Sequence, residues 1–101
     1  MRIDEPEIGI AVLHILAAQP NGRATVRRII REMPNYVRLS AEDQAASWTR
    51  NGEEIWEQQV RNLKSHSTAA GNIFNRGYVV QYSRGVWQIT TDGLRRVARA
   101  A

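Results

Sequence analysis

The spacing of apolar residues changes its period near residue 78, and this change limits the folds that the chain can adopt. Before that point, apolar side chains recur every three or four residues, as along one face of a helix. Between residues 78 and 90, β-branched and aromatic residues form two short runs on either side of Ser83-Arg84-Gly85. Two such runs joined by a tight turn predict a β-hairpin. We therefore expect a mainly α-helical fold with one small β-hairpin near the end of the chain.

Two helices are expected in the first third of the chain. The first begins near Pro6 and ends before Gln19-Pro20-Asn21-Gly22, a sequence that interrupts helices. The second starts after Thr25, whose hydroxyl is suited to cap a helix, and ends at Pro34. Residues 23–25 are expected to form a short strand just before it.

Two more helices are expected before the hairpin and one after it. Ser40 and Asp43 have the spacing of a capping box, which predicts a short polar helix of about two turns. A longer helix is expected over about 53–68, after the turn Asn51-Gly52. The apolar residues on its buried face are Trp56, Val60 and Leu63. A short terminal helix is expected to follow a cap at Thr91-Asp92-Gly93.

The 101 residues carry a formal net charge of +4 that is unevenly distributed along the chain. Residues 1–57 contain seven basic and nine acidic side chains, whereas residues 58–101 contain seven basic side chains and one acidic. Thirteen of the fourteen cations are arginines, and a guanidinium group can bind a phosphate or a guanine edge through two hydrogen bonds at once. This pattern favours a nucleic acid as the partner.

The composition argues against several other classes of protein. A chain without cysteine has neither disulfides nor thiolate zinc sites. The longest apolar stretch, residues 8–18, is shorter than the roughly 20 residues that span a bilayer, so we expect a single cytoplasmic domain over residues 1–101 without a membrane partner. His14 and His66 lack the spacing of a metal pair, and no catalytic motif is present. We therefore expect a binding domain, not an enzyme, with no metal and no cofactor.

Three helices followed by a basic hairpin are the layout of a winged helix-turn-helix domain. Residues 71–80 (GNIFNRGYVV) and 83–93 (SRGVWQITTDG) resemble the Mrr N-terminal type of winged helix, which is found on bacterial restriction endonucleases. Residues 22–30 (GRATVRRII) are similar to the second helix of that family. The resemblance extends over nearly the whole chain and is strongest in the hairpin.

The resemblance implies a module that recognises double-stranded DNA for a restriction system and leaves the chemistry to a separate nuclease domain, fused or associated. Some nuclease-associated winged helices read methylated bases. Because Gln58 and Asn62 suit adenine, N6-methyladenine is expected ahead of 5-methylcytosine. Two alternatives stay open at this point: a small stand-alone winged-helix transcriptional regulator, and a protein-interaction winged helix that does not bind DNA.

The helix over 53–68 is expected to be the recognition helix and to enter the major groove. At about 100° per residue, the side opposite its apolar face carries Gln58, Arg61, Asn62 and Ser65. In the major groove, arginine pairs with guanine, and glutamine or asparagine pairs with adenine. These four side chains are therefore the expected base readers.

Further candidate contacts lie outside this helix. Arg84 is at the turn of the hairpin 78–90, which is expected to lie on the DNA backbone or in the minor groove. The residues expected to contact a phosphate near the start of the recognition helix are Thr49, Arg50 and Asn51. Trp48 and Tyr36 are the candidates for the walls of a pocket that holds a modified base.

Overall fold

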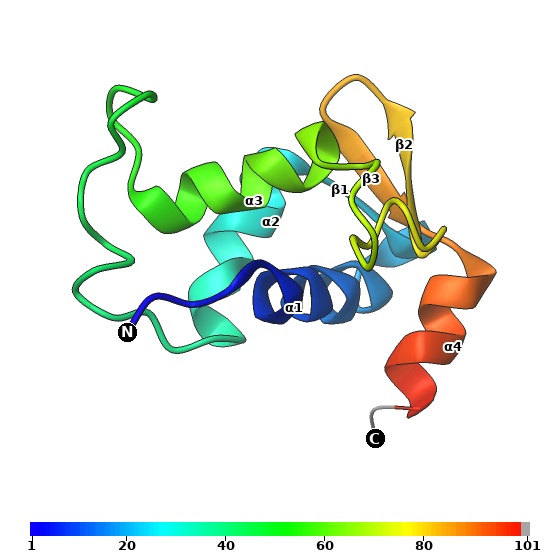
Figure 1. The fold of residues 1–101 in the computed structure, drawn as a ribbon. Coiled ribbons are helices and arrows are strands. Elements are labelled where there is room, and N and C mark those ends of the chain that lie inside the picture. Colours follow the sequence, from blue (N-terminus) through cyan, green and yellow to red (C-terminus); the bar gives the residue numbers. More distant parts are fainter. Residues whose placement is uncertain (100–101) are drawn as a thin grey trace.

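The computed structural model describes residues 1–99, which form four α-helices and a three-stranded antiparallel sheet (Figure 1). The helices are α1 (Glu5–Ala17), α2 (Val26–Glu32), α3 (Ile55–Ser65) and α4 (Thr91–Arg99), and the strands are β1 (Arg23–Thr25), β2 (Val79–Ser83) and β3 (Val86–Ile89). Short 3-10 turns, Pro20–Gly22 and Met33–Asn35, follow α1 and α2. The mixed helix and strand content agrees with the expected fold class, and the arrangement is compatible with a winged helix.

Strand β1 extends the β2–β3 hairpin into one sheet, in the order β1-β3-β2. Ala24 pairs with Trp87, and Val79 pairs with Ile89. All four of these residues are buried, so one face of the sheet belongs to the core. Gly85 in the hairpin turn has φ 73, a left-handed conformation that glycine adopts without strain. The structure thus confirms both the hairpin and the short strand expected at 23–25.

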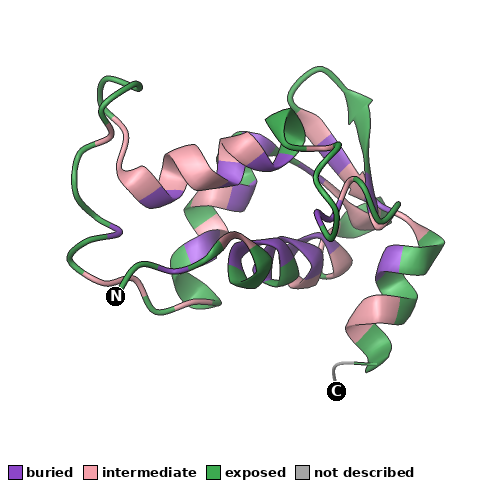
Figure 2. Ribbon diagram, viewed as in Figure 1, coloured by how far each residue is buried: buried purple, intermediate pink, exposed green. Residues whose placement is uncertain are grey.

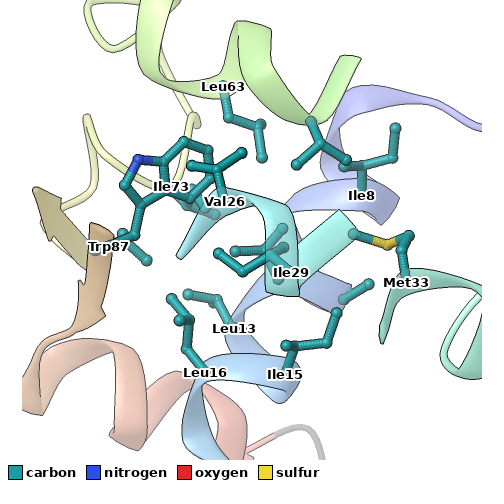
Figure 3. Packing of buried hydrophobic residues seen from close by; sticks show 14 of the residues in the cluster. Ile8, Leu13, Ile15, Leu16, Val26, Ile29, Met33, Leu63, Ile73 and Trp87 are labelled. Atoms are coloured by element: carbon teal, nitrogen blue, oxygen red, sulfur yellow. The ribbon is translucent and has the colours of Figure 1, made fainter. Parts of the chain in front are cut away.

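The hydrophobic core lies between α1, α2, α3 and the sheet (Figure 3). Much of α1 is buried, in contrast to α4, which is mostly exposed (Figure 2). The buried residues of α3 are Trp56, Val60 and Leu63, as the sequence predicted. The rings of Phe74 and Trp87 meet edge to face with their centroids 5.0 Å apart, a favourable aromatic geometry that fixes the loop after α3 against the sheet.

Helix α3 is shorter than the helix expected over 53–68. The backbone N–H groups of Ile55 and Trp56 donate to the carbonyl groups of Ala45 and Asp43, at 2.9 and 3.1 Å. These bonds join the start of α3 to residues 43 and 45 and not to the residues one turn before it, so the helix does not extend to residue 53. At its other end, α3 stops three residues earlier than expected, and the chain continues as a turn.

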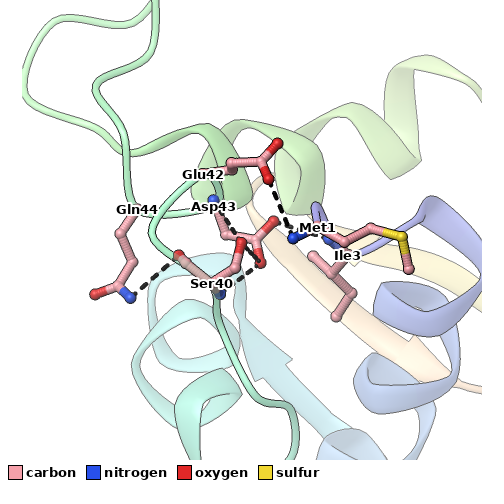
Figure 4. Close-up of polar contacts among 6 residues, drawn as sticks. All are labelled: Met1, Ile3, Ser40, Glu42, Asp43 and Gln44. Carbon is pink, nitrogen blue, oxygen red and sulfur yellow. Dashed lines mark hydrogen bonds and ion pairs between the residues drawn. The ribbon is translucent and has the colours of Figure 1, made fainter.

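The short polar helix expected after Ser40 is absent from the structure, although the contacts of the capping box are present. The Ser40 hydroxyl donates to Oδ2 of Asp43 at 3.0 Å, and the N–H of Asp43 donates to the Ser40 hydroxyl at 3.2 Å. The carboxylate of Asp43 also accepts the N–H of Ile3 at 2.9 Å (Figure 4). Because the Asp43 carbonyl group is bonded to Trp56 and not to a residue one turn ahead, only a turn forms over 41–44.

The terminal helix α4 is present, but its cap lies one residue before the expected 91–93. The hydroxyl oxygen of Thr90 accepts the N–H of Gly93 at 3.1 Å, which satisfies a backbone donor in the first turn. Among the helices of residues 1–99, none combines the length and the hydrophobicity needed to cross a bilayer.

Candidate nucleic-acid interface

The outer face of α3 lies between two projecting loops (Figure 1). One is the loop of residues 46–54, which precedes the helix, and the other is the turn between β2 and β3. Both extend beyond α3 on the side away from α1 (Figure 1). The face that the sequence predicts to enter a DNA groove therefore has a projection at each end.

The 46–54 loop is closed by backbone bonds and fastened to α3. An antiparallel bridge joins its two ends, and the N–H of Ser47 donates to the carbonyl group of Glu53 at 2.8 Å. The Ser47 hydroxyl donates to Oε1 of Gln58 at 2.6 Å. Its oxygen accepts the N–H groups of residues 49–50 at 3.3 and 3.1 Å. The loop thus has a defined position relative to the helix.

Arg61 contacts the same loop through an ion pair. Its Nε lies 2.7 Å from Oε2 of Glu53, and Nε of Arg50 lies 3.8 Å from Oε1 of the same carboxylate. The Arg61 side chain is only 28% exposed. Gln58 and Arg61 therefore lie on the predicted face of α3, and the 46–54 loop engages Oε1 of Gln58 and Nε of Arg61.

Asn62 and Ser65 occupy the C-terminal half of the same face. Ser65 is exposed and Asn62 is half-buried. Neither side chain takes part in any of the hydrogen bonds within residues 1–99, unlike Gln58 and Arg61. Of the four predicted base readers, these two are the ones whose side chains make no hydrogen bond within residues 1–99.

Two backbone segments that carry exposed arginines meet where the hairpin turn contacts the start of α2. The N–H of Val26 donates to the carbonyl group of Gly85 at 2.9 Å. This bond places Arg84 beside the first turn of α2, where Arg27 and Arg28 are exposed. None of these three arginines forms an ion pair with another residue of the described chain.

The sequence analysis identified Arg84 but not the α2 arginines as candidate contacts. Arg27 and Arg28 do fall outside the apolar face of their helix, and so does Arg31 one turn later. Their position outside the apolar face was the sequence feature that could have identified them as candidate contacts. Their proximity to Arg84 depends on the pairing of β1 with β3, which residue spacing alone does not determine.

In contrast to the start of α2, the first turn of α3 carries negative charge. Burial raises the pKa of the Glu57 carboxyl group, and the nearby carboxylates of Glu53 and Glu54 raise it further. Glu54 also accepts a hydrogen bond from Nε1 of Trp56 at 2.8 Å. No group of three or more acidic or histidine side chains within residues 1–99 is arranged to hold a metal ion. Phosphate attraction is therefore stronger at the hairpin than at this end of the helix.

The remaining predicted contacts lie on the surface. Thr49, Arg50 and Asn51 are all exposed near the tip of the 46–54 loop. Trp48 at the same tip is 97% exposed, and Tyr36 is 43% exposed. Neither aromatic residue lines the cavity of about 300 Å³ that lies between α1, α4 and the loop after α3. The modified-base pocket assigned to them stays a prediction.

No protein-family model, curated protein or solved structure matches this chain.

Proposed function

We propose that this chain is a winged-helix domain that binds double-stranded DNA, with the outer face of α3 in the major groove and the β2–β3 hairpin on the backbone or in the minor groove. The order of the elements supports this proposal, because three helices precede the hairpin and β1 completes its sheet. A helix of this kind fits the width of the major groove, and an adjacent hairpin can follow the backbone.

The observation that carries the proposal is the hydrogen bond between Val26 and Gly85. It holds together the backbone segments that carry Arg27, Arg28 and Arg84, and none of these arginines has a carboxylate partner within residues 1–99. Unpaired guanidinium groups bind phosphate oxygens strongly and set the position of a protein on the duplex. These arginines would supply most of the sequence-independent affinity.

Base recognition is assigned to Asn62 and Ser65, whose side chains make no hydrogen bond within residues 1–99. Asn62 can pair with an adenine edge in the major groove. Gln58 and Arg61 would act mainly by holding the 46–54 loop. We further propose that the domain serves a bacterial restriction system, with a nuclease supplied elsewhere, and that it favours N6-methyladenine. This last part follows from the resemblance and from the adenine-compatible side chains.

Titration of a labelled duplex at two salt concentrations tests the proposal. Affinity should fall steeply between about 50 and 200 mM salt, because each phosphate contact adds nearly one unit to the slope of log affinity against log salt. Arg84→Ala should weaken binding and lower that slope by about 1. Arg99→Ala is the matched control, since it removes the same charge from an exposed position of α4.

Two outcomes would contradict the proposal. The first is the absence of duplex binding at low salt, which would favour the protein-interaction alternative. The second is an equal loss of affinity in Arg84→Ala and Arg99→Ala, which would show that only net charge matters. Methylated and unmethylated copies of one duplex, compared in the same assay, test the preference for N6-methyladenine separately.

A further inference from the structure

Trp48 is the one tryptophan of this chain that lies outside the core. Its side chain is 97% exposed, whereas Trp56 and Trp87 are 5% and 2% exposed. A large aromatic side chain gains free energy when it leaves water, so a fully exposed indole is available for contact with a partner. Packing inside the described domain does not account for it.

The loop that carries Trp48 is ordered by contacts on both sides of it. Ser47, the preceding residue, donates through its backbone to Glu53 and through its hydroxyl to Gln58. Glu53 in turn holds Arg61 of α3. The backbone that carries the indole is thus held beside the α3 face, so binding through Trp48 would not require the loop itself to become ordered.

Charge shows what kind of contact this end of α3 can make. The carboxylates of Glu53, Glu54 and Glu57 outnumber the cations of Arg50 and Arg61 there. Attraction to phosphate is therefore weak, and the favourable contact that remains is apolar. Among the parts of a nucleic acid, the flat face of a base offers the broadest surface on which an indole can stack.

We infer that Trp48 stacks on an unpaired nucleobase, so that the domain binds duplex DNA interrupted by an unpaired base more tightly than fully paired DNA. This inference rests on the proposed function, because it places the duplex along α3. In a fully paired duplex every base face is already stacked, and inserting an indole costs a few kcal/mol of unstacking. An unpaired base presents its face at a smaller cost, because no base pair has to be broken.

Fluorescence can follow this contact directly. Equal-length duplexes are compared, one fully paired and one with a single unpaired adenine at its centre. The interrupted duplex should bind about tenfold more tightly and quench the emission of Trp48. In Trp48→Ala, which retains the two buried tryptophans, the quench and the preference should both disappear, and affinity for the paired duplex should change less than about twofold.

Two further variants and the salt dependence test whether the preference for the interrupted duplex comes from stacking by Trp48. Trp48→Phe should keep part of the preference, because phenylalanine can still stack. Leu94→Ala, which removes an exposed apolar side chain from α4, should keep all of it. The ratio of the two affinities should stay constant as salt rises, because stacking releases no counterions.

Each other outcome overturns the inference. If both duplexes bind equally well, or if Trp48→Ala keeps the preference, only the role of Trp48 fails and the proposed function stands. If neither duplex binds at low salt, the proposed function fails as well. If the emission of the free protein shifts with its concentration and Trp48→Ala removes that shift, a second copy of the chain covers the indole instead of a base.

Discussion

Arg61 of α3 forms an ion pair with Glu53 of the preceding loop, with Nε and Oε2 only 2.7 Å apart. The same carboxylate is 3.8 Å from Arg50. One acidic side chain therefore neutralises two of the cations nearest to the proposed groove-facing surface, and it also fastens the loop that carries Trp48. The pair limits what this end of α3 contributes to DNA affinity.

Glu53→Gln should strengthen duplex binding, because it frees the charges of Arg61 and Arg50 while keeping a similar shape. Affinity at low salt is expected to rise severalfold, and the slope of log affinity against log salt to steepen by about 1. Glu7→Gln is the control, since it removes an equal charge from an exposed position in the first turn of α1. Unchanged affinity in Glu53→Gln would mean that this end of α3 stays away from the duplex.

Asn62→Ala should alter sequence preference more than overall affinity. If its amide pairs with a base edge, the variant should lose about 1–3 kcal/mol of discrimination at one position of the target. Arg84→Ala, by contrast, should weaken binding to all sequences about equally. Selection from a random duplex pool, repeated with each variant, measures both effects. An unaltered ranking of sequences in Asn62→Ala would remove this residue from the proposed readers.

Sequence periodicity predicted those parts of the fold that depend on neighbouring residues. The buried face of α3, with Trp56, Val60 and Leu63, follows from helical spacing alone. The hairpin follows from two runs of strand-forming residues around Arg84-Gly85. In each case the residues that define the element are close in sequence, so a local pattern contains the information.

The candidate site was harder to predict because its contacts join distant residues. Gln58 and Arg61 were expected to be free, yet they bind a loop whose closure depends on backbone bonds across Ser47 and Glu53. A further long-range contact, which fastens the loop after α3 to the helix, depends on one residue that the sequence analysis did not single out. That residue, Asn72, is buried, donates to the carbonyl group of Leu63 at 2.9 Å and accepts the N–H of Phe74 at 2.7 Å.

Asp43 should make the stability of the protein sensitive to acid. Burial raises the pKa of its carboxyl group, but hydrogen bonds from Ser40 and Ile3 outweigh burial and hold the pKa below the ordinary value of 3.8. The folded protein therefore binds fewer protons than the unfolded chain in the acid range. The stability that this carboxylate provides is present above the ordinary pKa and is lost as pH falls through that value toward the lower, folded one.

Asp43→Asn should reduce the free energy of unfolding near pH 7 by about 1.5–3 kcal/mol, the value of hydrogen bonds to a charged group. Its stability should also fall less steeply below about pH 5. Urea denaturation at several pH values measures both quantities. Asp92→Asn, at a carboxylate that is 64% exposed and paired with Arg95, should keep the acid sensitivity of the wild type. An identical pH profile for the wild type and Asp43→Asn would contradict the assignment.

Gly93→Ala should destabilise the protein, although alanine is usually the better residue inside a helix. Helix propensity alone predicts a gain of about 1 kcal/mol. A Cβ atom at Gly93, however, would collide with the carbonyl oxygen of Tyr78 and with the side chain of Ile89. That carbonyl group also accepts the N–H of Thr90 at 2.9 Å, so it cannot move aside without breaking a backbone bond at the start of α4.

The expected cost of Gly93→Ala is about 2–4 kcal/mol, as for other substitutions that force backbone apart at a tight contact. Leu94→Ala, at the neighbouring residue of the same helix, is the control. Its side chain is 48% exposed, and the free energy of unfolding should change by no more than about 0.5 kcal/mol. Urea denaturation of the two variants compares them directly. A stabilised Gly93→Ala would mean that α4 does not pack against the hairpin as closely as described here, and that helix propensity alone governs this position.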